Sequence, residues 1–161
     1  MKAKMLLITT VILFTMSSCK KDSSDYLNVD IHISYIDKNG IDLLNSSNPN
    51  AIKAADIDLY YLKNGIKTRV FDPNMDTPEN FKIEYSESQH VYLIKIFINE
   101  YYDTNKMSET YIEFGGRSDT IKASWYANES KSNIHYLNVW YNNVLKIAEG
   151  SSIDFFEVVL D

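Results

Sequence analysis

Hydrophobic and polar residues alternate along most of this chain. In residues 26–36, every second residue is apolar, from Leu27 to Tyr35. A period of two residues is typical of a β-strand with one buried face. We expect further strands over residues 57–61, 66–71, 81–85, 90–100, 109–114, 119–126, 134–141, 144–147 and 153–160. No long stretch carries apolar side chains at helical spacing, so the pattern predicts an all-β chain.

Turn residues separate the predicted strands. Asn64-Gly65 stands directly between two alternating runs, and Asn142-Asn143 does the same further along the chain. Asn and Gly tolerate the positive φ angles that a tight hairpin requires. About nine or ten short strands with turn signals at this spacing are typical of a β-sandwich or barrel. We predict a single antiparallel β-sandwich over residues 26–161.

The N-terminal residues follow a different pattern. Two lysines precede an apolar run over residues 5–16, and two serines then lead to Cys19, the only cysteine. This order is that of a lipoprotein signal peptide. The apolar run is shorter than the roughly 20 residues that a membrane-spanning helix needs. We expect residues 1–18 to be a removed signal, Cys19 to carry lipid, and residues 19–25 to form a flexible tether.

The anchor and the charge of the chain narrow its classes of partner. Removal of Lys2 and Lys4 with the signal changes the formal charge from −6 to −8. Because the chain is acidic and has no basic cluster, we expect neither a nucleic-acid partner nor electrostatic docking on anionic lipid headgroups. Acylation of Cys19 leaves no thiol for a disulfide, a nucleophile or a thiolate metal site. We therefore expect a membrane-tethered chain, held by its core, without a cofactor.

Two parts of the sequence resemble a known group of proteins. The Ser17-Ser18-Cys19 box and the charged residues after it resemble lipoproteins of the Bacteroidota. The body is similar to small Bacteroidota lipoproteins of unknown function in segments over most of residues 26–149: Asp42-Leu43-Leu44, Asn48-Pro49, Tyr60 to Gly65, Asp119 to Lys122 and Val139 to Asn143. The resemblance implies an immunoglobulin-like β-sandwich in the outer membrane. The charged residues after the cysteine imply exposure at the cell surface. The resemblance implies no catalytic residue.

An acidic loop between two predicted strands is a candidate calcium site. Asp72, Asn74 and Asp76 stand at alternate positions, and Glu79 follows them. Alternating oxygen ligands are typical of the start of a calcium loop, although Thr77 stands where such a loop has glycine. Asx and proline turns between two strands explain the same residues without a metal. Both interpretations stay open.

Aromatic residues form the second candidate site. The chain has 12 tyrosines and 2 tryptophans. In residues 134–141, alternation places Tyr136 and Trp140 on the face opposite the predicted core, and we expect Tyr126 near them. Exposed aromatic faces in one contiguous strip suit stacking on sugar rings. The alternative is that these residues are good strand formers that cover a pleated surface.

The remaining polar residues show no pattern typical of an enzyme. His32, His90 and His135 lack the spacing of metal ligands. Asp56 and Asp58 project to one side, but a solvent-facing charged surface explains them as well as acid–base chemistry on a glycoside does. The sequence has no nucleophile elbow, zinc-protease motif or phosphate-binding glycine loop. We expect no enzymatic activity.

The function expected from these observations is that of a lipid-anchored binding or assembly module of the cell envelope. Its partner would be another envelope protein or an extracellular glycan. One alternative is glycan capture through Tyr126, Tyr136 and Trp140. Another is a structural subunit of an outer-membrane complex or surface fibre. Bare strand edges would favour a protein partner, because an extended segment can add to a sheet as a further strand.

Overall fold

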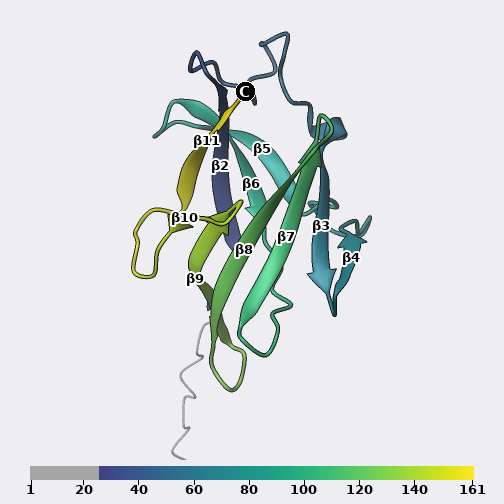
Figure 1. Cartoon of the computed structure of the whole chain (residues 1–161), viewed down its shortest axis with the longest axis vertical. Helices are drawn as coiled ribbons and strands as arrows, with labels where there is room; N and C mark the ends of the chain where they lie inside the picture. Colours follow the sequence, from purple (N-terminus) through teal and green to yellow (C-terminus); the bar gives the residue numbers. More distant parts are fainter. Residues whose placement is uncertain (1–25) are drawn as a thin grey trace, which may run out of the picture.

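The computed structural model describes residues 26–161, which fold into β-strands joined by turns and loops (Figure 1). The one helical segment in this range is the short 3-10 helix η1 (Ala54–Asp56). The eleven strands in this range are β1 (Tyr26–Asn28), β2 (Asp30–Asp37), β3 (Asp58–Lys63), β4 (Ile66–Arg69), β5 (Phe81–Ser86), β6 (Val91–Phe97), β7 (Met107–Phe114), β8 (Arg117–Ala127), β9 (Asn133–Tyr141), β10 (Val144–Ile147) and β11 (Phe155–Leu160). None of the described helices is long and apolar enough to cross a membrane. The prediction of an all-β chain is confirmed.

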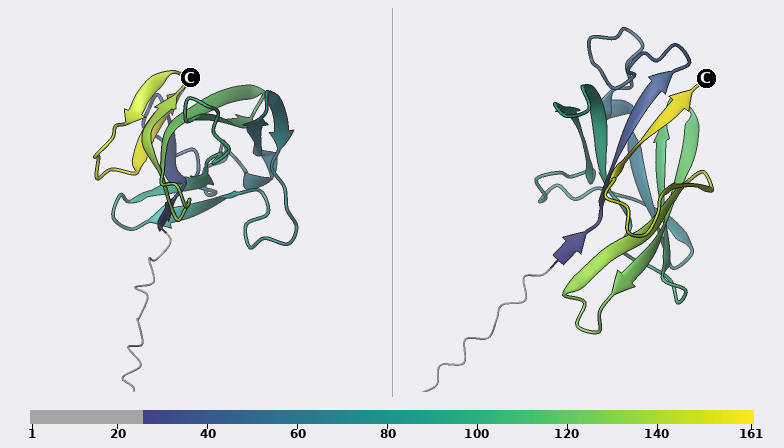
Figure 2. Two further views of the ribbon diagram at one scale, coloured as in Figure 1. Left: turned by 90° about the horizontal axis from the view of Figure 1, so that it is seen from below. Right: turned by 90° about the vertical axis from the view of Figure 1, so that its left-hand side faces the viewer.

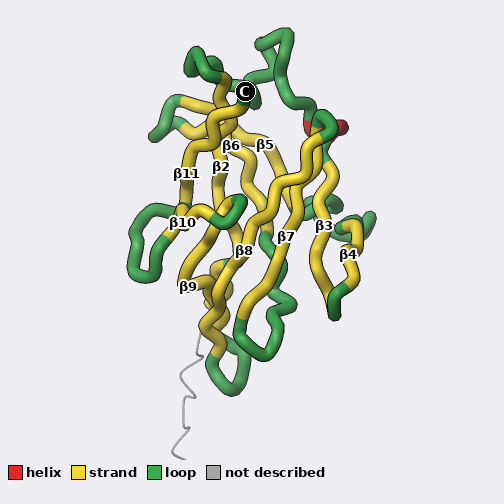
Figure 3. Tube along the Cα trace, in the orientation of Figure 1, coloured by secondary structure: helices red, strands yellow, loops and turns green. Residues whose placement is uncertain are grey.

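The strands form two sheets. The large sheet has seven strands in the order β1-β9-β8-β7-β3-β4, with β10 paired to β9. The small sheet has four strands in the order β11-β2-β6-β5. Figure 2 shows the two sheets on either side of a common interior, and Figure 3 shows loops at both ends of the strands and the β10–β11 loop at the side of the molecule.

The sheets are mixed, which corrects the prediction of a purely antiparallel arrangement. β1 pairs with β9 in parallel, and β11 pairs with β2 in parallel. The other strand pairs are antiparallel. Both parallel pairs join a strand near one end of the described chain to a strand far away in sequence. Alternation fixes which face of a strand is buried, but it carries no information about the direction of the neighbouring strand.

The first predicted strand, over residues 26–36, is divided in two. Val29 separates β1 from β2, and its carbonyl oxygen accepts a hydrogen bond from the backbone N–H of Ile98. β1 belongs to the large sheet and β2 to the small sheet. The chain therefore crosses between sheets without losing its alternation, and this is one reason why the count of strands exceeds the predicted nine or ten.

The predicted tight turns adopt the expected backbone conformation. Asn64 and Gly65 have φ angles of 53° and 77°, between β3 and β4. Asn142 and Asn143 have φ angles of 47° and 65°, between β9 and β10. Two successive residues with positive φ match the right-handed twist of the flanking strands. These positions fix the register of both hairpins.

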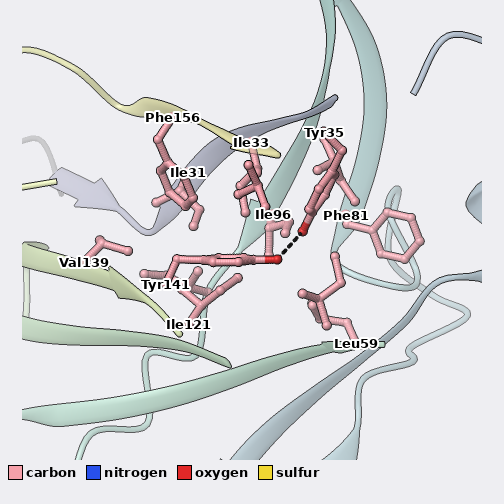
Figure 4. Close-up of a cluster of buried hydrophobic side chains, with 14 of the residues drawn as sticks. Ile31, Ile33, Tyr35, Leu59, Phe81, Ile96, Ile121, Val139, Tyr141 and Phe156 are labelled. Atoms are coloured by element: carbon pink, nitrogen blue, oxygen red, sulfur yellow. Dashed lines mark hydrogen bonds between the residues drawn. The ribbon is translucent and has the colours of Figure 1, made fainter. Parts of the chain in front are cut away.

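The core lies between the two sheets. Ile33 and Ile96 of the small sheet and Ile121 of the large sheet belong to one buried cluster (Figure 4). The phenol oxygens of Tyr35 and Tyr141 lie 3.2 Å apart in a buried hydrogen bond that joins the sheets. Each fully buried aliphatic side chain of this kind contributes about 1.5–3 kcal/mol. The buried side chains of the two sheets therefore form a single hydrophobic core.

Candidate functional site

The two sheets meet differently along their two sides. On one side, the Nζ of Lys146 in β10 lies 3.5 Å from the carbonyl oxygen of Glu157 in β11, so the sheet edges are close together. On the other side, the large sheet ends at β4 and the small sheet ends at β5. A loop over residues 70–80 joins these two edge strands. The second side is open, and it holds the candidate site.

A groove with a volume of about 560 Å³ runs along this open side. We call it the open-edge groove. Its apolar lining includes Leu27, Val29, Val70, Phe71, Met75, Phe97, Ile98 and Tyr101. Four of these side chains are more than half exposed: Leu27, Phe71, Met75 and Tyr101. Contiguous exposed apolar side chains of this size typically mark a binding surface.

Tyr61 forms a polar bridge beside the groove. Its hydroxyl group donates a hydrogen bond of 2.6 Å to the carbonyl oxygen of Phe97 and accepts one of 3.1 Å from the Nδ2 of Asn80. Phe97 belongs to the small sheet and Tyr61 to the large sheet. Burial raises the pKa of Tyr61 to about 12. The phenol therefore remains protonated, and it holds the two sheets together where their edges diverge.

Strand β4 borders the groove and is paired on one side only. All four of its residues are exposed, and 67% of the surface of Ile66 is accessible to solvent. The N–H of Val70, just after the strand, donates a hydrogen bond to the carbonyl oxygen of Leu59. Backbone groups alternate in direction along a strand. Those of Lys67 and Arg69 therefore point away from β3, and they are open to a further strand.

The side chains of β4 fix this edge strand against the outer face of the large sheet. Lys67 forms an ion pair with Glu113, and its ammonium group lies 4.7 Å and 4.6 Å from the ring centroids of Tyr60 and Tyr111. Arg69 forms an ion pair with Asp58 at 2.5 Å. Each exposed ion pair contributes about 0–1 kcal/mol. Together they hold β4 in place without covering its open edge.

The acidic loop is built from turns. The Oδ1 of Asp72 accepts hydrogen bonds from the backbone N–H and the Nδ2 of Asn74. The backbone N–H of Asp72 donates to the carbonyl oxygen of Pro78. Asp76 is exposed, and Glu79 is half-buried just before β5. Within residues 26–161, no three His, Cys, Asp or Glu side chains are grouped as a metal ion would need.

The three aromatic candidates do not share a face. Ser124 pairs with Asn138, but the next residue of β8, Trp125, pairs with Tyr136, so β9 contains an extra residue at this bulge. The bulge turns Tyr136 toward the interior, where its ring packs edge-on against Trp125 at 6.4 Å. Trp140 pairs with residues on the outward face of the large sheet. The expectation that Tyr136 points outward is therefore corrected.

The three histidines lie in separate places, and Tyr126 lies against one of them. Tyr126 is exposed and stacks on His135, with ring centroids 4.9 Å apart. His32 lies on the small sheet, 3.5 Å from Asp154. His90 has a φ angle of 57° in the turn between β5 and β6. The histidines are thus distributed over two sheets and a turn.

The aspartates proposed as a carboxylate pair also differ in position. Asp58 forms an ion pair with Arg69, whereas Asp56 ends the 3-10 helix and is exposed.

Cys19, the signal over residues 1–18 and the tether lie outside the described residues. The anchor therefore stays a prediction.

Sequence reasoning missed the open-edge groove. Phe71 and Met75 are large apolar residues in a polar loop next to a short strand, and this was the available signal. Which other residues would meet them depended on the pairing of β3 with β7 and of β2 with β6, which alternation does not encode.

Comparisons with family models, with curated proteins and with solved structures found no match to this chain. The open-edge groove and β4 offer apolar pockets and unpaired backbone groups side by side.

Proposed function

We propose that this chain is a lipid-anchored, non-enzymatic binding module of the cell envelope. Its partner is another envelope protein, which supplies an extended segment that adds to the large sheet alongside β4. The observation that carries this proposal is the uncovered edge of β4 beside the open-edge groove. Backbone hydrogen bonds to Lys67 and Arg69 would give affinity, and alternate side chains entering the groove would give specificity.

The fold that we propose for the module is an immunoglobulin-like β-sandwich. Two sheets that share a single buried cluster support the sandwich. The resemblance of the sequence to small Bacteroidota lipoproteins supports the finer class. Domains of this class commonly bind partners through their loops and strand edges, which agrees with a module that has no catalytic residues.

A peptide segment suits the site better than a glycan does. A peptide can satisfy the outward N–H and C=O groups of β4 while it fills an apolar groove. Glycan capture calls for a contiguous strip of exposed aromatic rings. Tyr136 is turned inward, and Tyr126 and Trp140 lie at different positions along the strands of the large sheet, so the three rings form no such strip. A structural subunit of a larger complex would use the same edge, so it is a variant of the same proposal.

The location that we propose is the outer membrane, through acylation of Cys19 after removal of residues 1–18. Several acyl chains give stable anchoring, because each buried CH₂ contributes about 0.8 kcal/mol. In the variant Cys19→Ala, we expect the uncleaved precursor to accumulate and the incorporation of labelled fatty acid to stop. Unchanged labelling would exclude this anchor.

Crosslinking in living cells tests the proposed partner. A photoreactive residue replaces Thr68, which lines the open-edge groove and is exposed. We expect irradiation to crosslink this position to one envelope polypeptide, within a segment that mass spectrometry can locate. The critical comparison uses two variants at Arg69. Arg69→Pro removes an outward N–H group, whereas Arg69→Ala removes only the side chain.

Both variants lose the ion pair with Asp58, so they differ only in the backbone donor and the restraint that proline imposes. We expect the crosslink to disappear in Arg69→Pro and to persist in Arg69→Ala. A urea-unfolding curve for each purified variant shows whether the fold is retained. A crosslink of equal strength in both variants, with both folded, would exclude strand addition. A shift of the melting temperature with a glycan, lost in Trp140→Ala, would favour glycan capture instead.

A further inference from the structure

One end of the molecule combines exposed apolar side chains with lysines. We call this end the base. It includes the start of β1, the β3–β4 turn, the chain over residues 100–106 before β7 and the β8–β9 turn (Figure 1). A hollow of about 600 Å³ joins three of these segments, because residues from each of them line it. The C-terminus lies at the opposite end.

Three large apolar or aromatic side chains project from the base. Leu27 is 56% exposed, Ile66 is 67% exposed and Tyr101 is 57% exposed. Leu27 and Tyr101 line the lower end of the open-edge groove, whereas Ile66 lies outside it. Such exposure has a free-energy cost in water, at about 25 cal/mol for each Å² of apolar surface. A partner that covers the base would recover this free energy.

Lysines lie next to the aromatic rings of the base. The Nζ of Lys63 lies 4.1 Å from the ring centroid of Tyr101, and the Nζ of Lys106 lies 4.4 Å from the ring centroid of Tyr102. Lys131 lines the same hollow. Tyrosine and lysine together are typical of surfaces at the boundary between water and lipid, since the ring lies among headgroups while the ammonium group reaches their phosphates.

The base also carries acidic residues, and these decide which lipid it suits. Glu100 and Asp103 line the hollow with the lysines, and Glu129 lies in the β8–β9 turn. Anionic lipid would gain little from a surface on which both signs are mixed. The apolar side chains would drive contact with the lipid. A zwitterionic headgroup carries both signs of charge, so it can interact with the lysines and with the acidic residues of the base.

The position of the N-terminus places the base near the membrane. Seven residues lead from Cys19 to Tyr26, where β1 begins. A fully extended chain spans at most about 3.6 Å for each residue, so this segment reaches about 25 Å at most. If Cys19 carries the lipid, the start of β1 stays within this distance of the bilayer. Of the two ends of the domain, the base is then the one that the tether keeps near the lipid surface.

We propose that the base is a membrane-docking surface that rests on zwitterionic phospholipid. This inference depends on the lipid anchor of the proposed function. Leu27, Ile66 and Tyr101 enter the boundary between headgroups and acyl chains, and Lys63 and Lys106 contact phosphate groups. The contact is weak by itself, but the tether makes it intramolecular, with an effective lipid concentration that a short linker keeps high. Docking would hold the domain upright and leave most of the outer edge of β4 accessible.

Spin labelling of the acylated protein in zwitterionic lipid nanodiscs tests this orientation. Cys19 is the only cysteine, so a single new cysteine can be labelled once the native thiol is acylated. The base variants are Ile66→Cys and Tyr101→Cys. The control is Lys38→Cys, in the exposed turn after β2 at the opposite end. Each nitroxide is measured for accessibility to oxygen, which concentrates in lipid, and to a water-soluble nickel chelate.

We expect the base labels to show at least about a threefold higher ratio of oxygen to nickel accessibility than the Lys38→Cys label, in keeping with insertion to about 5–10 Å. Equal, water-like ratios at all three positions would overturn the proposal. Protection of the base labels from both reagents would also overturn it, because protein contact would then cover the base.

A separate control keeps the anchor and the docking distinct. The parent protein, without a new cysteine, takes up spin label only if Cys19 is free. Label uptake by the parent would contradict the anchor. An unlabelled parent that stays with the nanodiscs, combined with water-like base labels, would contradict docking alone.

Discussion

Asp119 carries a charge into the interior, where 3% of its surface remains exposed. Arg117 donates two hydrogen bonds to its carboxylate, at 2.7 Å and 2.9 Å. The hydroxyl of Tyr141 donates a third at 2.6 Å, and the Nδ2 of Asn142 donates a fourth at 2.7 Å. The carboxylate thus joins β8 to the end of β9 and, through Tyr141, to Tyr35 in the small sheet.

Removal of this carboxylate should destabilise the fold. In Asp119→Ala, the buried hydroxyl of Tyr141 and the side-chain amide of Asn142 lose an acceptor, and we expect a loss of about 2–3 kcal/mol in the free energy of unfolding. Urea unfolding measures this loss. Asp76→Ala removes an exposed carboxylate from the acidic loop and should change stability by less than about 0.5 kcal/mol. Equal effects of the two substitutions would contradict the role of Asp119.

The same network predicts how stability depends on pH. Burial alone would raise the pKa of Asp119, but the hydrogen bonds from Arg117, Tyr141 and Asn142 outweigh it and lower the pKa below its usual range. A lowered pKa in the folded state means that the unfolded chain takes up a proton first as the pH falls. The stabilisation is therefore present above the ordinary aspartate pKa of about 4 and is lost as the pH falls below it.

Comparison with Asp119→Asn isolates this contribution. We expect the difference in free energy of unfolding between the wild type and this variant to shrink as the pH is lowered from about 6 to about 3. Chemical unfolding at each pH provides the measurement. A difference that stays constant over this range would show that Asp119 does not titrate with a lowered pKa.

At the scale of the elements, strand positions follow from the sequence but bulges do not. Alternation located most of the strands, and Asn-rich turns fixed the hairpins at residues 64–65 and 142–143. The bulge in β9 reverses the faces of residues 134–136 relative to the simple alternation. A single extra residue has this effect because the side-chain period of a strand is two. Nothing in the local pattern of β9 marks the position of that residue.

The bulge predicts unequal roles for two aromatic residues of β9. Tyr136 packs against Trp125 and the core, whereas Trp140 lies on the outer face beside Lys122. We expect Tyr136→Ala to cost about 2 kcal/mol in the free energy of unfolding, and Trp140→Ala to cost about 1 kcal/mol or less. Urea unfolding of both variants checks this. A larger cost for Trp140→Ala would contradict the assigned faces.

The edge strands show the same limit of sequence reasoning. A strand was predicted over residues 66–71, but the pattern gave no sign that all four residues of β4 would be exposed. Edge exposure depends on which strands pair with β3, and only the fold determines this. The sequence pattern could therefore predict that β4 is a strand, but it could not predict that this strand has an open edge that can serve as a binding site.

At the scale of the whole molecule, the proposed anchor, groove and base have different tasks, and the groove and the base meet at Leu27 and Tyr101. The tether would bring the base to the lipid, and the base would orient the domain. The open-edge groove extends from Leu27 and Tyr101 at the base to Met75 in the loop after β4, and Thr68 and Arg69 of β4 border it. The sequence pattern predicted the all-β class, which the structure confirms, and the anchor, which stays a prediction. Long-range strand pairing, which the local alternation does not reveal, brought Leu27, Phe71 and Tyr101 together.

Amide hydrogen exchange along β4 tests whether a partner strand binds at this edge. The N–H groups of Lys67 and Arg69 point outward, whereas that of Val70 is bonded to Leu59 and serves as an internal control. We expect the two outward amides to exchange at least about tenfold more slowly in the intact cell envelope than in the purified protein, because a partner strand would bond them. The amide of Val70 should stay protected in both. Equally fast exchange of Lys67 and Arg69 in both settings would contradict strand addition at β4.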